Sequence, residues 1–140
     1  MQLLSFEIGG ERYGLDFSLI AEVIPLVEMR KLPHVPEYIS GVFSYRGVIT
    51  PAVDICVLFT GKEAQKLLST RIIIINYKNP ADISGQSHFL GLIAERVTET
   101  VVYSITEMQQ SGITNNETQY LGEIISAGSG TLQRIIPEKI

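Results

Sequence analysis

Alternation of apolar and polar residues predicts a β-hairpin at the start of the chain. The stretch "LLSFEI", Leu3–Ile8, puts alternate apolar side chains on one face, and "ERYGLDF", Glu11–Phe17, follows after the pair Gly9 and Gly10. Two glycines permit the backbone of a tight turn, and period-two alternation is typical of strands. The two stretches are therefore expected to pair with each other.

The next stretch, "SLIAEVI", predicts a helix of about two turns, because its apolar residues recur at helical spacing. Ser18 can act as the N-cap and Pro25 would end the helix. Its apolar positions are Leu19, Ile20, Val23 and Ile24.

Short strands and turns fill the rest of the chain. "RIIIINY", Arg71–Tyr77, is a continuous apolar run of the kind that is buried on both faces. Pro51 places its strand at an edge or a bulge. Ser104 and Glu107 have the form of a capping box, and Pro137 suits the first turn of a helix. Further strands are expected at Gly41–Phe43 and Val48–Leu58, on either side of a Ser44–Gly47 turn, at His88–Tyr103 as one long or two short strands, at Tyr120–Ser126, and after Gly128–Gly130.

This pattern predicts a mainly β protein. About nine or ten short strands with little helix favour small barrels or a sandwich. The polar link Thr60–Thr70 divides the strands into two sets, which favours two barrels over one.

Composition narrows the functional class. The 140 residues are 45% apolar and 19% charged, with a net charge of −4, as expected of a well-packed globular protein. The closest basic cluster is Arg30-Lys31, which argues against nucleic-acid binding. No apolar run approaches the ~20 residues of a membrane span, and no signal-peptide pattern is present, so we expect a cytoplasmic protein without membrane insertion. The single Cys56 is expected to be a small buried hydrophobe.

Catalytic chemistry has few candidates in this sequence. His34 and His88 could serve as bases, but both are expected to be surface residues. The spacings that bind zinc, phosphate or dinucleotides do not occur, and no nucleophile-elbow motif is present. Asp54 and Glu22 could form a carboxylate pair, which carries little weight without a base or a metal. We therefore predict no enzymatic activity, no metal site and no cofactor.

Arg46 stands out because it interrupts a strand-like region, "GVFSYRGV", and is followed by Gly47. A guanidinium offers five donors in a planar fork, which suits recognition of a partner. The residues alone leave a second reading equally open, a solvated arginine in a hairpin loop.

Three stretches in combination resemble the CheW family of chemotaxis coupling proteins: "YGLDFSLIAEVI", "LPHVPEYISGVFSYRGVITPAVDI" and "FLGLIAERVTETV". The resemblance extends from Phe6 to about Ile136. It rests on Tyr13-Gly14, a short segment with Glu22, a Pro-x-x-Pro-x-(Tyr/Phe)-Ile-x-Gly-Val run, Arg-Gly-Val-Ile-x-Pro, and Val53-Asp54.

This resemblance implies a single domain, residues 1–140, with two five-stranded SH3-like β-barrel subdomains packed around a shared core and with short helices. The approximate subdomains are residues 12–66, and residues 67–140 together with the N-terminal strand, residues 1–11. The implied function is that of a non-catalytic adaptor. It would couple the cytoplasmic tip of methyl-accepting chemotaxis receptors to the regulatory domain of a CheA-type histidine kinase.

Motif positions also imply residue roles. A receptor helix is expected to lie in a groove between the barrels, in contact with Ile20 and Val23, although these two could equally belong to the core, and Glu22 could be a solvated residue. The implied receptor-binding residues are Phe17, Ile20, Glu22, Val23, Arg46 and Gly47. The implied structural residues are Tyr13, Gly14, Gly41, Asp54 and Gly91, with Asp54 as an acceptor of backbone or arginine hydrogen bonds.

The sequence departs from the family pattern in two places. Ser44-Tyr45 stands where Asn-Leu is common before Arg-Gly, and Ala94-Glu95 stands where Val-Asp is usual. Three alternatives remain open: the same fold in a pilus-motility or other kinase array, the regulatory domain of the kinase itself, and a small β-barrel enzyme that uses acidic residues.

Overall fold

The computed structural model describes residues 2–78, 87–102, 108–109, 120–127 and 130–137. It is mainly β, as predicted. The strands are β1 (Gln2–Ile8), β2 (Glu11–Asp16), β3 (Ile20–Pro25), β4 (Ile39–Tyr45), β5 (Val48–Asp54), β6 (Arg71–Lys78), β7 (Ser87–Val102), β8 (Met108–Gln109), β9 (Leu121–Ala127) and β10 (Gly130–Ile135). A 3-10 helix, η1 (Phe17–Leu19), and an α-helix, α1 (Ile55–Thr60), complete the described elements.

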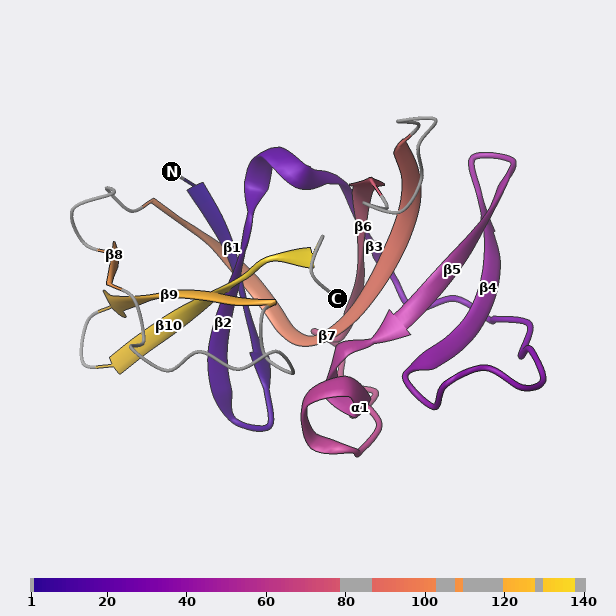
Figure 1. The fold of residues 1–140 in the computed structure, drawn as a ribbon, viewed down its shortest axis with the longest axis horizontal. Coiled ribbons are helices and arrows are strands. Elements are labelled where there is room, and N and C mark those ends of the chain that lie inside the picture. Colours follow the sequence, from indigo (N-terminus) through magenta and orange to yellow (C-terminus); the bar gives the residue numbers. More distant parts are fainter. Residues whose placement is uncertain (1, 79–86, 103–107, 110–119, 128–129, 138–140) are drawn as a thin grey trace.

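One long strand, β7, joins two groups of strands (Figure 1). Its first half pairs with β6 and, in parallel, with β5. Its second half pairs with β1, and the chain bends between the halves at Arg96, whose φ is 49°. The β1 group continues through β2, β10 and β9 to β8, whereas β3 pairs with β6 and β4 with β5. The pairing forms an open path, so two closed barrels are not confirmed.

The apolar residues form two clusters, and β6 contributes to both. Its residues Ile72–Ile75 are fully buried, which confirms the prediction for this run. Ile73 and Ile75 face the first cluster and Ile72 and Ile74 the second. The first cluster also contains Phe6 of β1, so the two groups of strands share it as a common core.

The hairpin predicted at the start of the chain is confirmed, because β1 and β2 pair antiparallel across Gly9 and Gly10. The predicted helix that begins at Ser18 is wrong. Asp16, not Ser18, caps the short η1, and its Oδ1 accepts hydrogen bonds from the Ser18 amide and hydroxyl. The residues that follow form β3, which pairs with β6. Hydrogen bonds to a strand some fifty residues further along override the local helical spacing.

The strand predicted to run from Val48 to Leu58 is also wrong at its end. It stops at Asp54, and α1 begins at Ile55 and ends before Gly61, which has the left-handed φ of 78°. The strands predicted around residues 88–103 and 120–126 are confirmed as β7 and β9. The capping box at Ser104 and the helix after Pro137 lie outside the described residues.

Candidate functional site

The turn between β4 and β5 consists of two residues, Arg46 and Gly47. Their φ angles are 49° and 77°, and Tyr45 pairs with Val48 on either side of them. Two successive left-handed residues are typical of the tight turn that matches the twist of a hairpin. A Cβ at Gly47 would meet no atom within 4 Å, so this glycine is required for its backbone angle and not for space. Arg46 therefore lies at the tip of the β4–β5 hairpin. The hairpin is at the right of Figure 1, with its turn uppermost.

Glu22 of β3 receives two hydrogen bonds from this hairpin. Its Oε1 accepts from Arg46 Nη2 at 2.9 Å and from the Tyr45 hydroxyl at 2.8 Å. Arg46 Cζ lies 5.2 Å from the centre of the Tyr45 ring, within range of a cation–π contact. The Arg46 and Glu22 side chains are 64% and 42% exposed, so solvent screens the ion pair. The three residues, named here the Glu22–Tyr45–Arg46 cluster, combine two predicted site residues with one that the site prediction missed.

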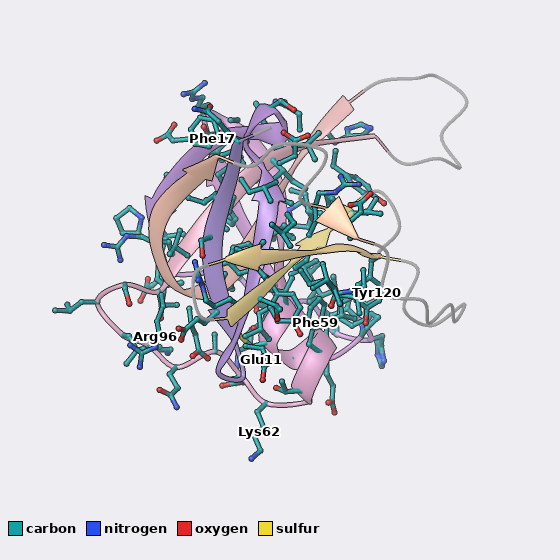
Figure 2. The ribbon with its side chains drawn as sticks, turned by 90° about the vertical axis from the view of Figure 1, so that its left-hand side faces the viewer. Glu11, Phe17, Phe59, Lys62, Arg96 and Tyr120 are labelled. Carbon is teal, nitrogen blue, oxygen red and sulfur yellow. The ribbon has the colours of Figure 1, made fainter. Side chains whose placement is uncertain are left out.

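The other predicted receptor-facing residues differ in how far they are exposed. Since β3 is a strand and not a helix, Ile20 is directed inward and packs against the first apolar cluster. Val23, which pairs with Ile73 of β6, is 37% exposed. Phe17, in η1, is 43% exposed, and Figure 2 shows it at the opposite end of the molecule from Lys62. Val23 and Phe17 are accessible to a partner, whereas Ile20 is half-buried against the first apolar cluster.

Gly41 allows the segment around Arg30 to cross β4. The amide and carbonyl of Arg30 exchange hydrogen bonds of 2.8 and 2.9 Å with Val42. A Cβ on Gly41 would lie 2.5 Å from the Arg30 carbonyl oxygen, and the φ of Gly41 is 149°. Gly14 and Gly91, the other predicted structural glycines, lie in paired, buried positions of β2 and β7.

Tyr13 belongs to a row of three aromatic rings. Its ring meets Phe59 of α1 edge-on at 5.2 Å, and Phe59 stacks on Tyr120 at 5.1 Å. Phe59 and Tyr120 lie close together near α1 in Figure 2. Burial, followed by the charge of Glu11, raises the pKa of the Tyr13 hydroxyl. The row joins β2, α1 and the start of β9, and the site prediction included only Tyr13.

Asp54 is a buried structural residue. Its Oδ1 accepts from the amides of Cys56 at 2.9 Å and Val57 at 3.4 Å, and its Oδ2 accepts from the amide of Ala64 at 3.0 Å. It thereby caps α1 and holds the loop that follows. Burial raises the pKa of this carboxyl, and the backbone donors oppose that shift.

A cavity of about 670 Å³ lies between the segment that precedes β4 and the loop that follows α1. None of the predicted receptor-facing residues lines it. The enzyme alternative needs at least two of Asp54, Glu22 and His88 in one pocket. This cavity contains only Asp54, and both oxygens of that carboxylate already accept backbone hydrogen bonds.

The remaining candidate groups do not assemble into a reactive centre within the described part of the chain. No three His, Cys, Asp or Glu side chains there are grouped closely enough to hold a metal ion. The Cys56 thiol donates to Glu95 Oε1 at 3.6 Å, and burial is the largest cause that raises its pKa. Cys56 is 2% exposed, in agreement with the expected buried hydrophobe. None of the described helices is both long and apolar enough to cross a membrane.

These features define a mainly β domain whose charged cluster lies at the tip of one hairpin. The chain belongs to the family of CheW-like domains, whose model matches residues 2–137.

Three comparisons give the context of that assignment. The chemotaxis protein CheW of Klebsiella aerogenes is 28% identical over 108 residues, which cover 75% of this chain and 65% of that protein. The chemotaxis protein CheW of Treponema pallidum is 25% identical over 137 residues, covering 94% of this chain and 76% of that protein. The crystal structure of the scaffolding protein TtCheW from Thermoanaerobacter tengcongensis superimposes with a TM-score of 0.81 at 27% identity, covering 96% of this chain and 82% of that one. The chain thus spans slightly less than two thirds of the first relative and about three quarters of the second.

Proposed function

We propose that this protein is a non-catalytic adaptor of a chemotaxis signalling array. In this role it couples the cytoplasmic tip of chemoreceptors to the regulatory domain of a CheA-type histidine kinase in the cytoplasm. Membership of the CheW-like family, two relatives named as chemotaxis proteins and a structural neighbour named as a scaffolding protein support the proposal. One observation connects the proposal to particular residues: Arg46 is exposed at a hairpin tip and forms an ion pair with Glu22.

The receptor-facing surface consists of Arg46 and Gly47 at the tip, with Glu22 behind them. Exposed apolar side chains adjoin the tip in sequence, because Val48 and Ile49 are 48% and 69% exposed. A helical receptor segment packs its apolar face on such side chains, and Arg46 adds a directional, charge-assisted contact. Val23 and Phe17 are exposed candidates outside this cluster, while Ile20 packs against the first apolar cluster.

The division into two subdomains stays part of this proposal. The pairing of the strands supports a boundary inside β7 at Arg96, with β2 in the β1 group and β6 beside β3. This grouping differs from the predicted one, which separated β1 from β2 and β3 from β6. A pilus-motility or other kinase array, or a kinase regulatory domain, would use the same surfaces. Both relatives are named as chemotaxis proteins, which favours chemotaxis.

Charge reversal at Arg46 tests the proposal. Arg46→Glu places a second carboxylate beside Glu22 and removes the directional contact, so we expect loss of capture by an immobilised receptor cytoplasmic fragment. The exposed ion pair and the cation–π contact contribute together about 1 kcal/mol, so the melting temperature should fall by only a few degrees.

Arg96→Glu is a matched control. Arg96 also has a φ of 49°, is 57% exposed and bonds a glutamate, Glu7, at 2.9 Å, but it lies at the bend of β7. The control should keep receptor binding, and both variants should co-purify with the kinase regulatory domain. Equal receptor binding by Arg46→Glu and wild type would refute the assigned surface, and an unfolded Arg46→Glu variant would make Arg46 a structural residue.

A further inference from the structure

Tyr45 contacts both members of the exposed ion pair. Its hydroxyl donates to Glu22 Oε1 at 2.8 Å, and the same oxygen accepts from Arg46 Nη2 at 2.9 Å. Its ring also lies 5.2 Å from Arg46 Cζ. One buried side chain therefore fixes the acceptor oxygen of the pair and lies against the cation.

The Tyr45 ring is itself held in place from the other side. It meets Phe89 of β7 edge-on, with ring centres 5.1 Å apart and planes at 87°. Tyr45 is 6% exposed and belongs to the second apolar cluster, together with Phe43 and Ile74. A tyrosine has few rotatable bonds, so a packed ring positions its hydroxyl with little freedom. The rigid core of the β4–β7 region is thus connected through this hydroxyl to an otherwise exposed ion pair.

An exposed arginine without such a support samples many rotamers, and ordering it on binding lowers affinity. An isolated surface ion pair is a weak restraint because water competes for both partners. Burial, followed by the hydrogen bond to Glu22, raises the pKa of Tyr45, so the hydroxyl remains a donor at neutral pH. The contact of Arg46 with Glu22 uses Nη2, and a guanidinium has five N–H donors, so most of the fork stays available to acceptor oxygens of a partner.

We propose that Tyr45 is a positioning residue that orders the Glu22–Arg46 pair before a partner binds. The binding consequence rests on the function proposed above, whereas the ordering of Arg46 does not. This device depends on the hydroxyl of Tyr45, which donates to Glu22.

The experiment compares Tyr45→Phe with wild type. This substitution keeps the ring, its packing on Phe89 and the cation–π contact, and removes only the donor to Glu22. Nitrogen-15 relaxation of the Arg46 Nε–H group reports the order of the guanidinium in the free protein. We expect a lower order parameter for Arg46 in Tyr45→Phe, and no change in Tyr77→Phe, which removes a hydroxyl from β6. Equal Arg46 order in wild type and Tyr45→Phe, or an equal loss in Tyr77→Phe, would overturn the proposal.

A second measurement uses the receptor cytoplasmic fragment as the probe. Tyr45→Phe should weaken its binding by about 2–10-fold, the value of one net hydrogen bond. The same substitution in a Glu22→Gln background should have a much smaller effect, because the acceptor charge is already gone. Additive effects of the two substitutions would contradict the role of Tyr45. Absence of binding by the wild type would refute the proposed function, while the Arg46 order parameter would still decide the role of Tyr45.

Discussion

Asp54 offers a stability test whose magnitude follows from three hydrogen bonds. Replacement by alanine removes the acceptor for the amides of Cys56 and Val57 at the start of α1, and for the amide of Ala64 in the next loop. Loss of an N-cap costs about 0.5–2 kcal/mol. A buried amide left without a partner costs about 1–3 kcal/mol. We therefore expect Asp54→Ala to lower the free energy of unfolding by about 1.5–5 kcal/mol, a large part of the usual ~5–15 kcal/mol.

Asp54→Asn is the matched variant, because it keeps the size of the side chain. Its carbonyl oxygen can still cap α1, but its amide group then faces the Ala64 N–H, donor against donor. We expect a stability between those of wild type and Asp54→Ala.

The difference in stability between wild type and Asp54→Asn should depend on pH. Burial raises the pKa of Asp54 above its ordinary value of 3.8, so the native state binds the proton more tightly than the unfolded state. The stabilisation that comes from proton binding at Asp54 is therefore fully present below the unfolded pKa. It is lost as the pH rises through the native pKa. The advantage of wild type over Asp54→Asn should be larger at acid than at neutral pH.

Urea unfolding followed by circular dichroism measures the three free energies, provided that the m-values agree. Hydrogen exchange of the Ala64 amide locates the effect, since its protection should fall in both variants. A loss below about 1 kcal/mol for Asp54→Ala, or an asparagine variant as stable as wild type at acid pH, would refute the reasoning.

Two further predictions concern packing and charge. Gly41→Ala should destabilise the protein by more than about 2 kcal/mol in thermal unfolding, because its Cβ would meet the Arg30 carbonyl oxygen. Gly47→Ala, which meets no atom within 4 Å, should cost only about 1–2 kcal/mol for its positive φ, and equal losses would contradict the steric argument. Hydrogen bonds from Arg134 lower the pKa of Glu123, so this pair stabilises the protein above the ordinary value of 4.5 and less as the pH falls through the lowered pKa. Glu123→Gln should reduce stability by up to about 1 kcal/mol at pH 7 and by less at pH 3, and a constant difference would contradict the assignment.

The sequence was most informative where pattern and turn chemistry agreed. The first hairpin has alternation on both sides of two glycines, and β6 has four consecutive isoleucines that no exposed element would carry. Helix α1 was missed although its caps are visible in the sequence as Asp54 and Gly61. Its β-branched residues Ile55 and Val57 favoured the prediction of a strand. The capping residues on either side indicate a helix instead.

The candidate site was harder to predict because it depends on pairing between distant segments. The helical spacing predicts one partner-facing surface for Ile20 and Val23, whereas in β3 Ile20 packs against the first apolar cluster and Val23 is 37% exposed. A register shift between Ile20 and Glu22 in the pairing with β6 also accompanies the approach of Glu22 to the hairpin tip. The motif identified Glu22 and Arg46 separately, but neither its spacing nor its order shows that they touch.

The Glu22–Tyr45–Arg46 cluster also explains why a barrel was a reasonable prediction for this region. Strands β3 and β4 lie at opposite ends of the path β3–β6–β7–β5–β4, and the described residues include no backbone ladder between them. Nevertheless, Glu22 from one end bonds Tyr45 and Arg46 at the other. The sheet must therefore curl until its two ends meet through side chains, over the apolar cluster that contains Ile72 and Ile74. The cluster is buried and the ion pair is exposed, so the cluster contributes more to this curl than the ion pair does. Substitutions at Glu22 or Arg46 should therefore change the contacts available to a partner without unfolding the sheet.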